Sequence, residues 1–189
     1  MVGLERLQTL DMKLNNIQNV PPGLFCPLKN LARVDFSSNA ITDLNNLGLS
    51  HDKHIPEEFR CDIPVQSLRL RNNGLITVTP RALGALGSLK YLDLSYNKVD
   101  VLVTSTFEGL SNLEEIDLSN NQLAAIPPNI FAYTPKLRIV ILSNNTLGTI
   151  DLEVFHNLTN LQTLNMSGNN LDENWIRPGI FSGNFCIEF

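Results

Sequence analysis

Apolar residues recur along most of the chain in a pattern that repeats about every 24 residues. Each copy has apolar residues at its first, fourth, sixth and eleventh positions and asparagine at its ninth, in the form L-x-x-L-x-L-x-x-N-x-L. The copies begin at Leu7, Leu31, Val65, Leu89, Leu113, Leu137 and Leu161. Apolar residues two apart predict a short strand in each copy, because side chains two apart point to the same face of a strand.

The constant spacing predicts how these strands are arranged. Each strand pairs in parallel with the same strand of the next copy, and the remaining residues form a return arm. The ninth-position asparagines then stack as a ladder, because a buried amide both donates and accepts hydrogen bonds where the backbone leaves the strand. This ladder comprises Asn15, Asn39, Asn73, Asn97, Asn121, Asn145 and Asn169. The predicted fold is α/β, a solenoid with a parallel β-sheet on its concave face.

The return arms carry their own repeating positions. A large apolar residue stands at the nineteenth position of most copies, and we expect it to fill the convex side. These residues are Phe25, Leu83, Phe107, Phe131 and Phe155. Pro21-Pro22 and Pro127-Pro128 fall on the arms, which favours irregular or short-helical backbone there.

The second copy contains ten additional residues within a charge-dense stretch at about 48–64. We interpret this stretch as a loop that projects from the arm, and as a second candidate contact surface. His51, His54 and Cys61 lie in it, but their spacing matches no common zinc motif and no fourth ligand is evident. We therefore predict neither a metal site nor a cofactor.

Cys26 and Cys61 lie on neighbouring arms, and a disulfide between them would tie the inserted loop to the frame. The alternative is two partly buried thiols. Cys186 has no evident partner.

These features together resemble a known family. The repeating pattern is the leucine-rich repeat signature. The stretch GLFCPLKNL (residues 23–31), the expanded second repeat with its cysteine and the segment NWIRPGIFSG (residues 174–183) resemble the ectodomain of invertebrate Toll-type receptors, the long Toll subfamily in particular. The terminal FCIEF does not continue the repeat.

The resemblance implies a glycoprotein receptor with an extracellular horseshoe, a membrane span and an intracellular TIR domain. Such receptors recognise a protein ligand or co-receptor, dimerise, and signal in innate immunity or development. A secreted or matrix leucine-rich repeat protein with a structural or adhesive role remains an alternative, and an intracellular scaffold is a third.

Charge, the absence of some segments and the placement of the histidines limit the possible partners and functions. The net charge of −5 argues against nucleic acid as a partner. The chain has no apolar run of membrane-spanning length, no signal peptide, and no capping repeat at either end. We therefore expect residues 1–189 to be a segment of a longer array, attached to a membrane only through other regions. The three histidines lie in one loop and one distant arm, which predicts no catalytic constellation and no enzyme.

Three N-x-S/T motifs agree with an extracellular location, although an asparagine-rich chain produces such motifs by chance. They begin at Asn144, Asn157 and Asn165. Asn157 lies on a return arm and is the strongest candidate for glycosylation. Asn165 points out of a strand on the concave face, where a glycan would obstruct a ligand.

Side chains that point outward from the strands form the candidate partner-binding surface. Most are charged, but Ile139 and Ile141 present apolar groups where other copies have polar ones. The candidate residues are Arg69, Arg71, Tyr91, Tyr96, Glu115, Ile139 and Ile141. Two alternatives stay open: the arginines form internal salt bridges with Asp93, or the isoleucines are a harmless exposed pair.

Overall fold

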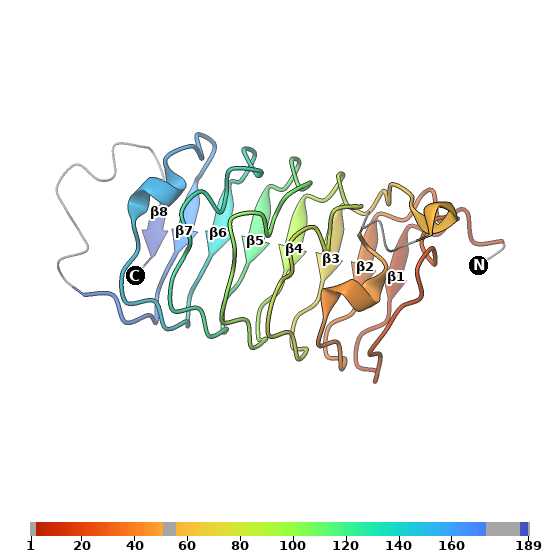
Figure 1. Cartoon of the computed structure of the whole chain (residues 1–189), viewed down its shortest axis with the longest axis horizontal. Coiled ribbons are helices and arrows are strands. Elements are labelled where there is room, and N and C mark those ends of the chain that lie inside the picture. Colours follow the sequence, from red (N-terminus) through yellow and green to blue (C-terminus); the bar gives the residue numbers. More distant parts are fainter. Residues whose placement is uncertain (1–2, 51–55, 173–185, 189) are drawn as a thin grey trace.

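The chain forms a solenoid whose coils each contribute one short strand to a single sheet. The structure is a computed structural model that describes residues 3–50, 56–172 and 186–188. Eight parallel strands follow one another across the sheet in sequence order (Figure 1). The strands are β1 (Thr9–Asp11), β2 (Arg33–Asp35), β3 (Ser67–Arg69), β4 (Tyr91–Asp93), β5 (Glu115–Asp117), β6 (Ile139–Ile141), β7 (Thr163–Asn165) and β8 (Cys186–Glu188). This confirms the predicted solenoid with its parallel sheet.

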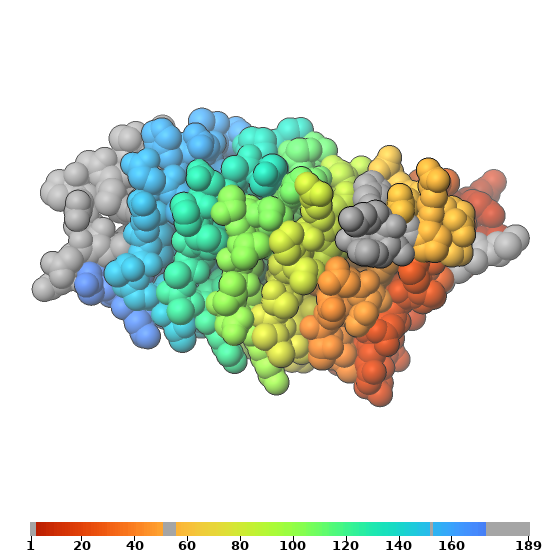
Figure 2. Space-filling view, viewed as in Figure 1, coloured from red at the N-terminus to blue at the C-terminus, as the bar shows by residue number. Residues whose placement is uncertain are grey.

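The pairing keeps equivalent repeat positions opposite one another from β1 to β7. Each of these strands occupies the third to fifth positions of its repeat, so Leu10 pairs with Val34 and Leu92 with Ile116. The ten additional residues of the second repeat do not alter this register, because Arg33 still pairs with Ser67. The coils therefore form successive bands across the molecule, as the space-filling view shows (Figure 2).

The arms opposite the sheet are mostly turns. Three short 3-10 helices lie in the described arms: η1 (Leu44–Leu47), η2 (Glu57–Phe59) and η3 (Leu152–Phe155). Phenylalanines fill the space between arms and sheet. The rings of Phe107 and Phe131 stack at 6.2 Å and those of Phe131 and Phe155 at 5.7 Å, measured between centroids. One apolar core therefore runs through consecutive coils.

The ninth-position asparagines join neighbouring coils by hydrogen bonds. The Asn121 side chain donates to the carbonyls of Leu118, in its own coil, and Leu94, in the preceding coil, both at 3.0 Å. Its Oδ1 accepts the N–H of Val99, also in the preceding coil, at 2.9 Å. Asn15 lies in the first coil and bonds only carbonyls of its own coil among the described residues. The amide thus satisfies the backbone groups of two coils where the strands end.

The eighth position of every repeat has left-handed backbone, with φ between 53° and 67°. The residues there are Leu14, Ser38, Asn72, Tyr96, Asn120, Asn144 and Gly168. Asparagine and glycine adopt this conformation readily, whereas large side chains do so at a cost. Tyr96 and Leu14 are therefore exceptions in an otherwise favourable series.

The two ends of the inserted stretch do not project from the arm. Leu49 and Ile63, near its two ends, are buried in the core. The Ile63 N–H donates to the Ala85 carbonyl at 3.0 Å, and the Ala85 N–H donates to the Leu49 carbonyl at 2.9 Å. The prediction of a projecting loop over the whole of 48–64 was wrong, because both ends pack against the next coil.

Cys26 and Cys61 form a disulfide with their Cα atoms 5.7 Å apart. Beside it, the Phe59 ring lies against Gly23 so closely that a Cβ at position 23 would be 2.6 Å from the ring. Gly23 also has a φ of 77°, which favours glycine. The disulfide and this contact hold the second part of the insertion on the first arm.

The C-terminal segment adds one strand to the sheet, although its sequence does not continue the repeat pattern. Cys186–Glu188 pairs in parallel with β7, with Ile187 opposite Leu164. The sheet therefore continues into FCIEF, with Cys186 one residue earlier than the 24-residue spacing would place it.

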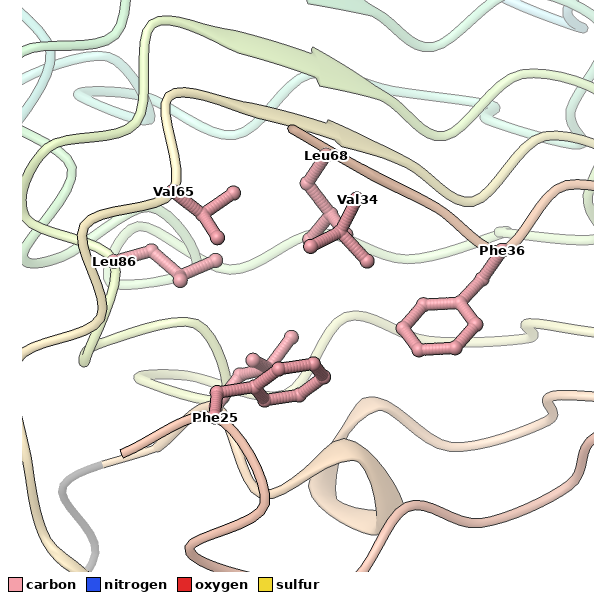
Figure 3. A pocket seen from close by; sticks show the side chains of 7 residues that line it. Phe25, Val34, Phe36, Val65, Leu68 and Leu86 are labelled. Atoms are coloured by element: carbon pink, nitrogen blue, oxygen red, sulfur yellow. The ribbon is translucent and has the colours of Figure 1, made fainter. Parts of the chain in front are cut away.

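Seven apolar residues near the insertion surround a space that is too small for a water molecule. Figure 3 shows Phe25, Val34 and Phe36 packed with Val65, Leu68 and Leu86, all from the interior of the solenoid. Because its walls are core residues in contact with one another, this space is part of the packing and not a ligand site.

Replacing Asn121 with alanine tests the ladder. We expect N121A to lower the free energy of unfolding by about 3 kcal/mol, because it leaves buried backbone groups of two coils without partners. N15A is the matched control and should cost less than about 1 kcal/mol, since Asn15 bonds only its own coil. Urea unfolding measures both, and equal losses would contradict a role for the amide between coils.

Replacing both Cys26 and Cys61 with serine tests the disulfide. Loss of a bond that closes 35 residues should lower the free energy of unfolding by about 4 kcal/mol through chain entropy. The reduced wild-type chain is the control and should match the variant. If mass spectrometry of the unreduced protein found both thiols alkylated, the bond would not exist in solution.

Candidate functional site

The outward side chains of β3 to β6 form the candidate site. The middle residue of each of these strands is buried, and the residues on either side of it point the other way. Together with Arg71 and Tyr96, which follow β3 and β4, they include all seven individual residues that the sequence proposes for partner binding. We call this surface the central strip: Arg69, Arg71, Tyr91, Tyr96, Glu115, Ile139 and Ile141.

Two arginines of one coil stack on two tyrosines of the next. The Arg69 guanidinium lies 5.4 Å from the centroid of the Tyr91 ring, and that of Arg71 lies 3.8 Å from the Tyr96 centroid. Both distances are within the range of cation–π attraction. The Arg71 Nη1 also donates to the Ser95 Oγ at 3.0 Å, and that hydroxyl donates to the Asp93 Oδ1 at 2.6 Å.

The salt bridges with Asp93, which the sequence left open as an alternative, are absent from the described residues. Arg69 instead pairs with Asp35 of the preceding strand at 4.0 Å. Asp93 is buried and accepts both the N–H and the hydroxyl of Ser95, so its carboxylate is already engaged.

Most acidic residues along the centre of the sheet serve its backbone. Asp35 accepts the N–H of Ser37 at 2.9 Å and Asp117 accepts that of Ser119 at 2.8 Å, each two residues further on. A carboxylate in this position holds the turn that follows the strand. Sequence reasoning treated these aspartates only as surface charge, although the recurring D-x-S spacing could have indicated their role. Arg69 and Ile141 occupy the same repeat position without an oxygen to accept such a bond.

Glu115 lies between Tyr91 and Ile139 in the register of the sheet. Burial raises the pKa of its carboxyl, and the nearby carboxylates of Asp117 and Asp93 raise it further. The adjacent Glu114 has the opposite environment, because a hydrogen bond from Lys90, 3.0 Å away, lowers the pKa of its carboxyl. The strip therefore holds a carboxylate that its surroundings disfavour.

Ile139 and Ile141 are partly exposed on β6. Their neighbours in the register are acidic on one side, Glu115 and Asp117, and polar on the other, Thr163 and Asn165. The chemistry of the strip thus changes from strand to strand, with a guanidinium on β3, a phenol on β4, a carboxylate on β5 and aliphatic groups on β6.

Comparison with known proteins places this arrangement in a family. Family models described as leucine rich repeat match residues 63–123, 111–171 and 160–184. The chain belongs to the leucine-rich repeat family. Members of this family act as modules for protein–protein interaction.

Individual leucine-rich repeat proteins resemble the chain over part of their length. Toll-like receptor 7 of Drosophila melanogaster is 30% identical over 111 residues, which cover 58% of this chain and 8% of the receptor. Keratocan of Gallus gallus is also 30% identical over 111 residues, covering 52% of this chain and 31% of keratocan. The chain therefore spans less than a third of either relative.

The structure is similar to Toll in the solved complex of Toll with Spatzle, described as a molecular hub in Drosophila development and innate immunity. The TM-score is 0.71 with 31% identity, covering 89% of this chain and 21% of that one. Among the described residues, none of the helices is long and apolar enough to cross a membrane.

The three N-x-S/T motifs of this leucine-rich repeat chain differ in environment. Asn157 is exposed on the arm that follows η3. Asn144 is exposed at a left-handed turn, with its side chain against Gly168. The Asn165 Oδ1 accepts the Ser167 N–H at 3.0 Å and its hydroxyl at 2.8 Å, so the asparagine and the serine of this motif are hydrogen-bonded to each other. Asn144 and Asn157 are thus both exposed, whereas Asn165 is only partly exposed.

The residues weighed for metal or catalytic chemistry are not brought together where the structure describes them. Cys61 is in the disulfide, and His156 is exposed on a different arm. His51 and His54 lie outside the described residues. Within the described ranges, no three histidine, cysteine, aspartate or glutamate residues form a group suited to a metal ion.

Replacing Glu115 with glutamine tests its environment. The raised pKa means that the folded chain holds this proton more tightly than the unfolded chain, so stability falls as pH rises above the ordinary value of 4.5. E115Q should therefore be more stable than the wild type at pH 7 and lose this advantage below about pH 4. E114Q, beside it, should be less stable at pH 7 because the pKa of Glu114 is lowered. Urea unfolding at both pH values measures the effect, and the same sign for both variants would refute the assignment.

Proposed function

We propose that this chain is a ligand-binding segment of the ectodomain of a Toll-type cell-surface receptor, which takes part in innate immune or developmental signalling. The central strip binds a protein ligand or co-receptor, and dimerisation and signalling involve regions outside the chain. The observation that carries the proposal is the change in chemistry at β3 to β6. Most coils place a turn-holding aspartate at the fifth position of the repeat, whereas two coils of the strip have Arg69 and Ile141 there. The strip also presents the exposed Tyr96 and the partly exposed Tyr91.

Aromatic, arginine and aliphatic side chains together are typical of the energetic centres of protein interfaces. All of the strip except Arg71 and Tyr96 lies on strands, which hold side chains more rigidly than loops would. Partner binding then requires little ordering of the receptor surface, which lowers the entropic cost of association.

The extracellular location in this proposal is supported by the Cys26–Cys61 disulfide, because such bonds persist mainly in oxidising compartments. The exposed Asn157 motif supports it as a glycosylation site. The similarity to Toll-like receptor 7 and to Toll in sequence and structure favours the receptor class.

The similarity to keratocan favours a second candidate, a secreted leucine-rich repeat protein with a structural or adhesive role in the matrix. The complete transcript separates the two. A membrane span and a TIR domain downstream of these repeats support the receptor, and a stop codon after a cysteine-rich cap supports the matrix protein.

The variant that carries both Ile139→Asp and Ile141→Asp tests the strip. The chain is first screened against secreted proteins and ectodomains from the same organism. For a partner found in this way, the double variant should weaken binding by about 30-fold, which corresponds to about 2 kcal/mol at an interface centre.

The matched control replaces Ile76 and Val101 with aspartate. These aliphatic residues are exposed at 54% and 56% and lie outside the eight strands of the sheet, next to or within the isolated bridge between Thr77 and Val101. The control should leave the affinity unchanged. A partner that binds the Ile139/Ile141 variant as tightly as the wild type would exclude the strip as its binding surface.

A further inference from the structure

Arg71 and Tyr96 make the shorter of the two arginine–tyrosine contacts in the central strip. The guanidinium lies 3.8 Å from the centroid of the tyrosine ring, against 5.4 Å for Arg69 and Tyr91. On another side, Arg71 donates to Ser95, whose hydroxyl is fixed by the buried Asp93. Contacts from two directions therefore hold the guanidinium in one orientation while Arg71 itself stays exposed.

The backbone at Tyr96 is unfavourable for tyrosine. Its φ is 55°, in the left-handed region, where a large side chain costs energy. The equivalent position in other coils is mostly occupied by Asn72, Asn120, Asn144, Ser38 and Gly168, which are smaller or better suited to it. Packing does not require the ring, because Tyr96 is 46% exposed. The feature that distinguishes it is the stack with Arg71.

The charge of Arg71 is not balanced by a carboxylate within the described residues. The ion pair on this part of the sheet joins Arg69 to Asp35, and Asp93 is engaged with Ser95. A guanidinium has five N–H donors in a planar fork that matches a carboxylate, and one of its nitrogens is used here by Ser95.

We infer that Arg71, oriented by Tyr96 and Ser95, binds an aspartate or glutamate side chain of the protein partner. This inference rests on the proposed function and adds the chemistry of the partner to it. Tyr96 is a positioning residue, since it fixes the guanidinium from behind and leaves the remaining donors to a bidentate carboxylate.

The surroundings favour a single carboxylate over a polyanion. Asp35, Asp93 and Asp117 lie along the same sheet, and Glu115 lies beside Tyr91. A nucleic acid would bring several phosphates against these carboxylates, whereas one acidic side chain brings a single negative charge to Arg71. The net charge of −5 also disfavours a polyanionic partner.

Peptide selection tests the inference without knowledge of the natural partner. Phage-displayed random dodecapeptides are selected on the immobilised 189-residue chain, and the affinities of the selected peptides are measured by fluorescence polarisation. We expect a consensus with an aspartate or glutamate. Its replacement by the amide should weaken binding at least tenfold, and R71A should do the same. In R71A the amide replacement should have almost no further effect, since the two groups act as a pair.

Three further variants sharpen the result. R71K should weaken binding, because lysine keeps the charge but loses the planar fork. Y96N should weaken binding severalfold while the unfolding midpoint stays the same or rises, since asparagine suits the left-handed backbone. R33A is the matched control on β2, where Arg33 bonds Thr9, and should leave binding unchanged.

Selected peptides without an acidic residue, no selected peptide at all, or peptides insensitive to R71A would overturn the inference. Binding of a 20-nucleotide polyuridine RNA that R71A abolishes would also overturn it, in favour of phosphate. Peptides that require Ile139 and Ile141 but tolerate R71A would support the proposed function and would contradict only the inference that Arg71 binds a carboxylate.

Discussion

The structure depends on satisfying the backbone where each very short strand ends. A strand of three residues contributes few hydrogen bonds, so its coil is fixed largely by the turn that leaves the strand. The ninth-position amide bonds its own coil and the preceding one, as Asn97 does with Leu94 and Leu70. The fifth-position carboxylate holds the N–H two residues later, and the eighth residue turns the chain through left-handed backbone. Coils built in this way stack in one register, which presents their outward side chains as a continuous surface.

The need to hold the turn after each strand explains which surface residues are informative about a binding partner. Where a coil uses aspartate at the fifth position, the charge is already committed to the turn, and its presence at the surface says little about a partner. Arg69 and Ile141 cannot fill that role, and Tyr96 occupies a position that disfavours it. These coils lack the locally favourable residues in the part of the sheet where exposed and partly exposed aromatic, cationic and aliphatic side chains lie close together. Departures from local consistency are expected at functional sites in particular.

The repeat could be predicted from the sequence because each of its signals is local and recurs. Apolar spacing placed the strands, and the expected solenoid is the observed one. The remaining features depend on contacts that spacing does not encode. Arg69 lies between Asp35 and Asp93 in the register, and only the structure shows that Ser95 engages Asp93 and leaves Arg69 to Asp35. The burial of Leu49 and Ile63 likewise depends on hydrogen bonds to Ala85 in another coil.

The central claim is that a protein partner binds the sheet surface of β3 to β6. Methyl cross-saturation measures it most directly, with isoleucine-labelled chain and unlabelled partner. The claim predicts that saturation of the partner attenuates the methyl signals of Ile139 and Ile141, while the exposed Ile76 outside the sheet and the buried Ile41 keep theirs. Attenuation at Ile76 with none at Ile139 and Ile141 would contradict it.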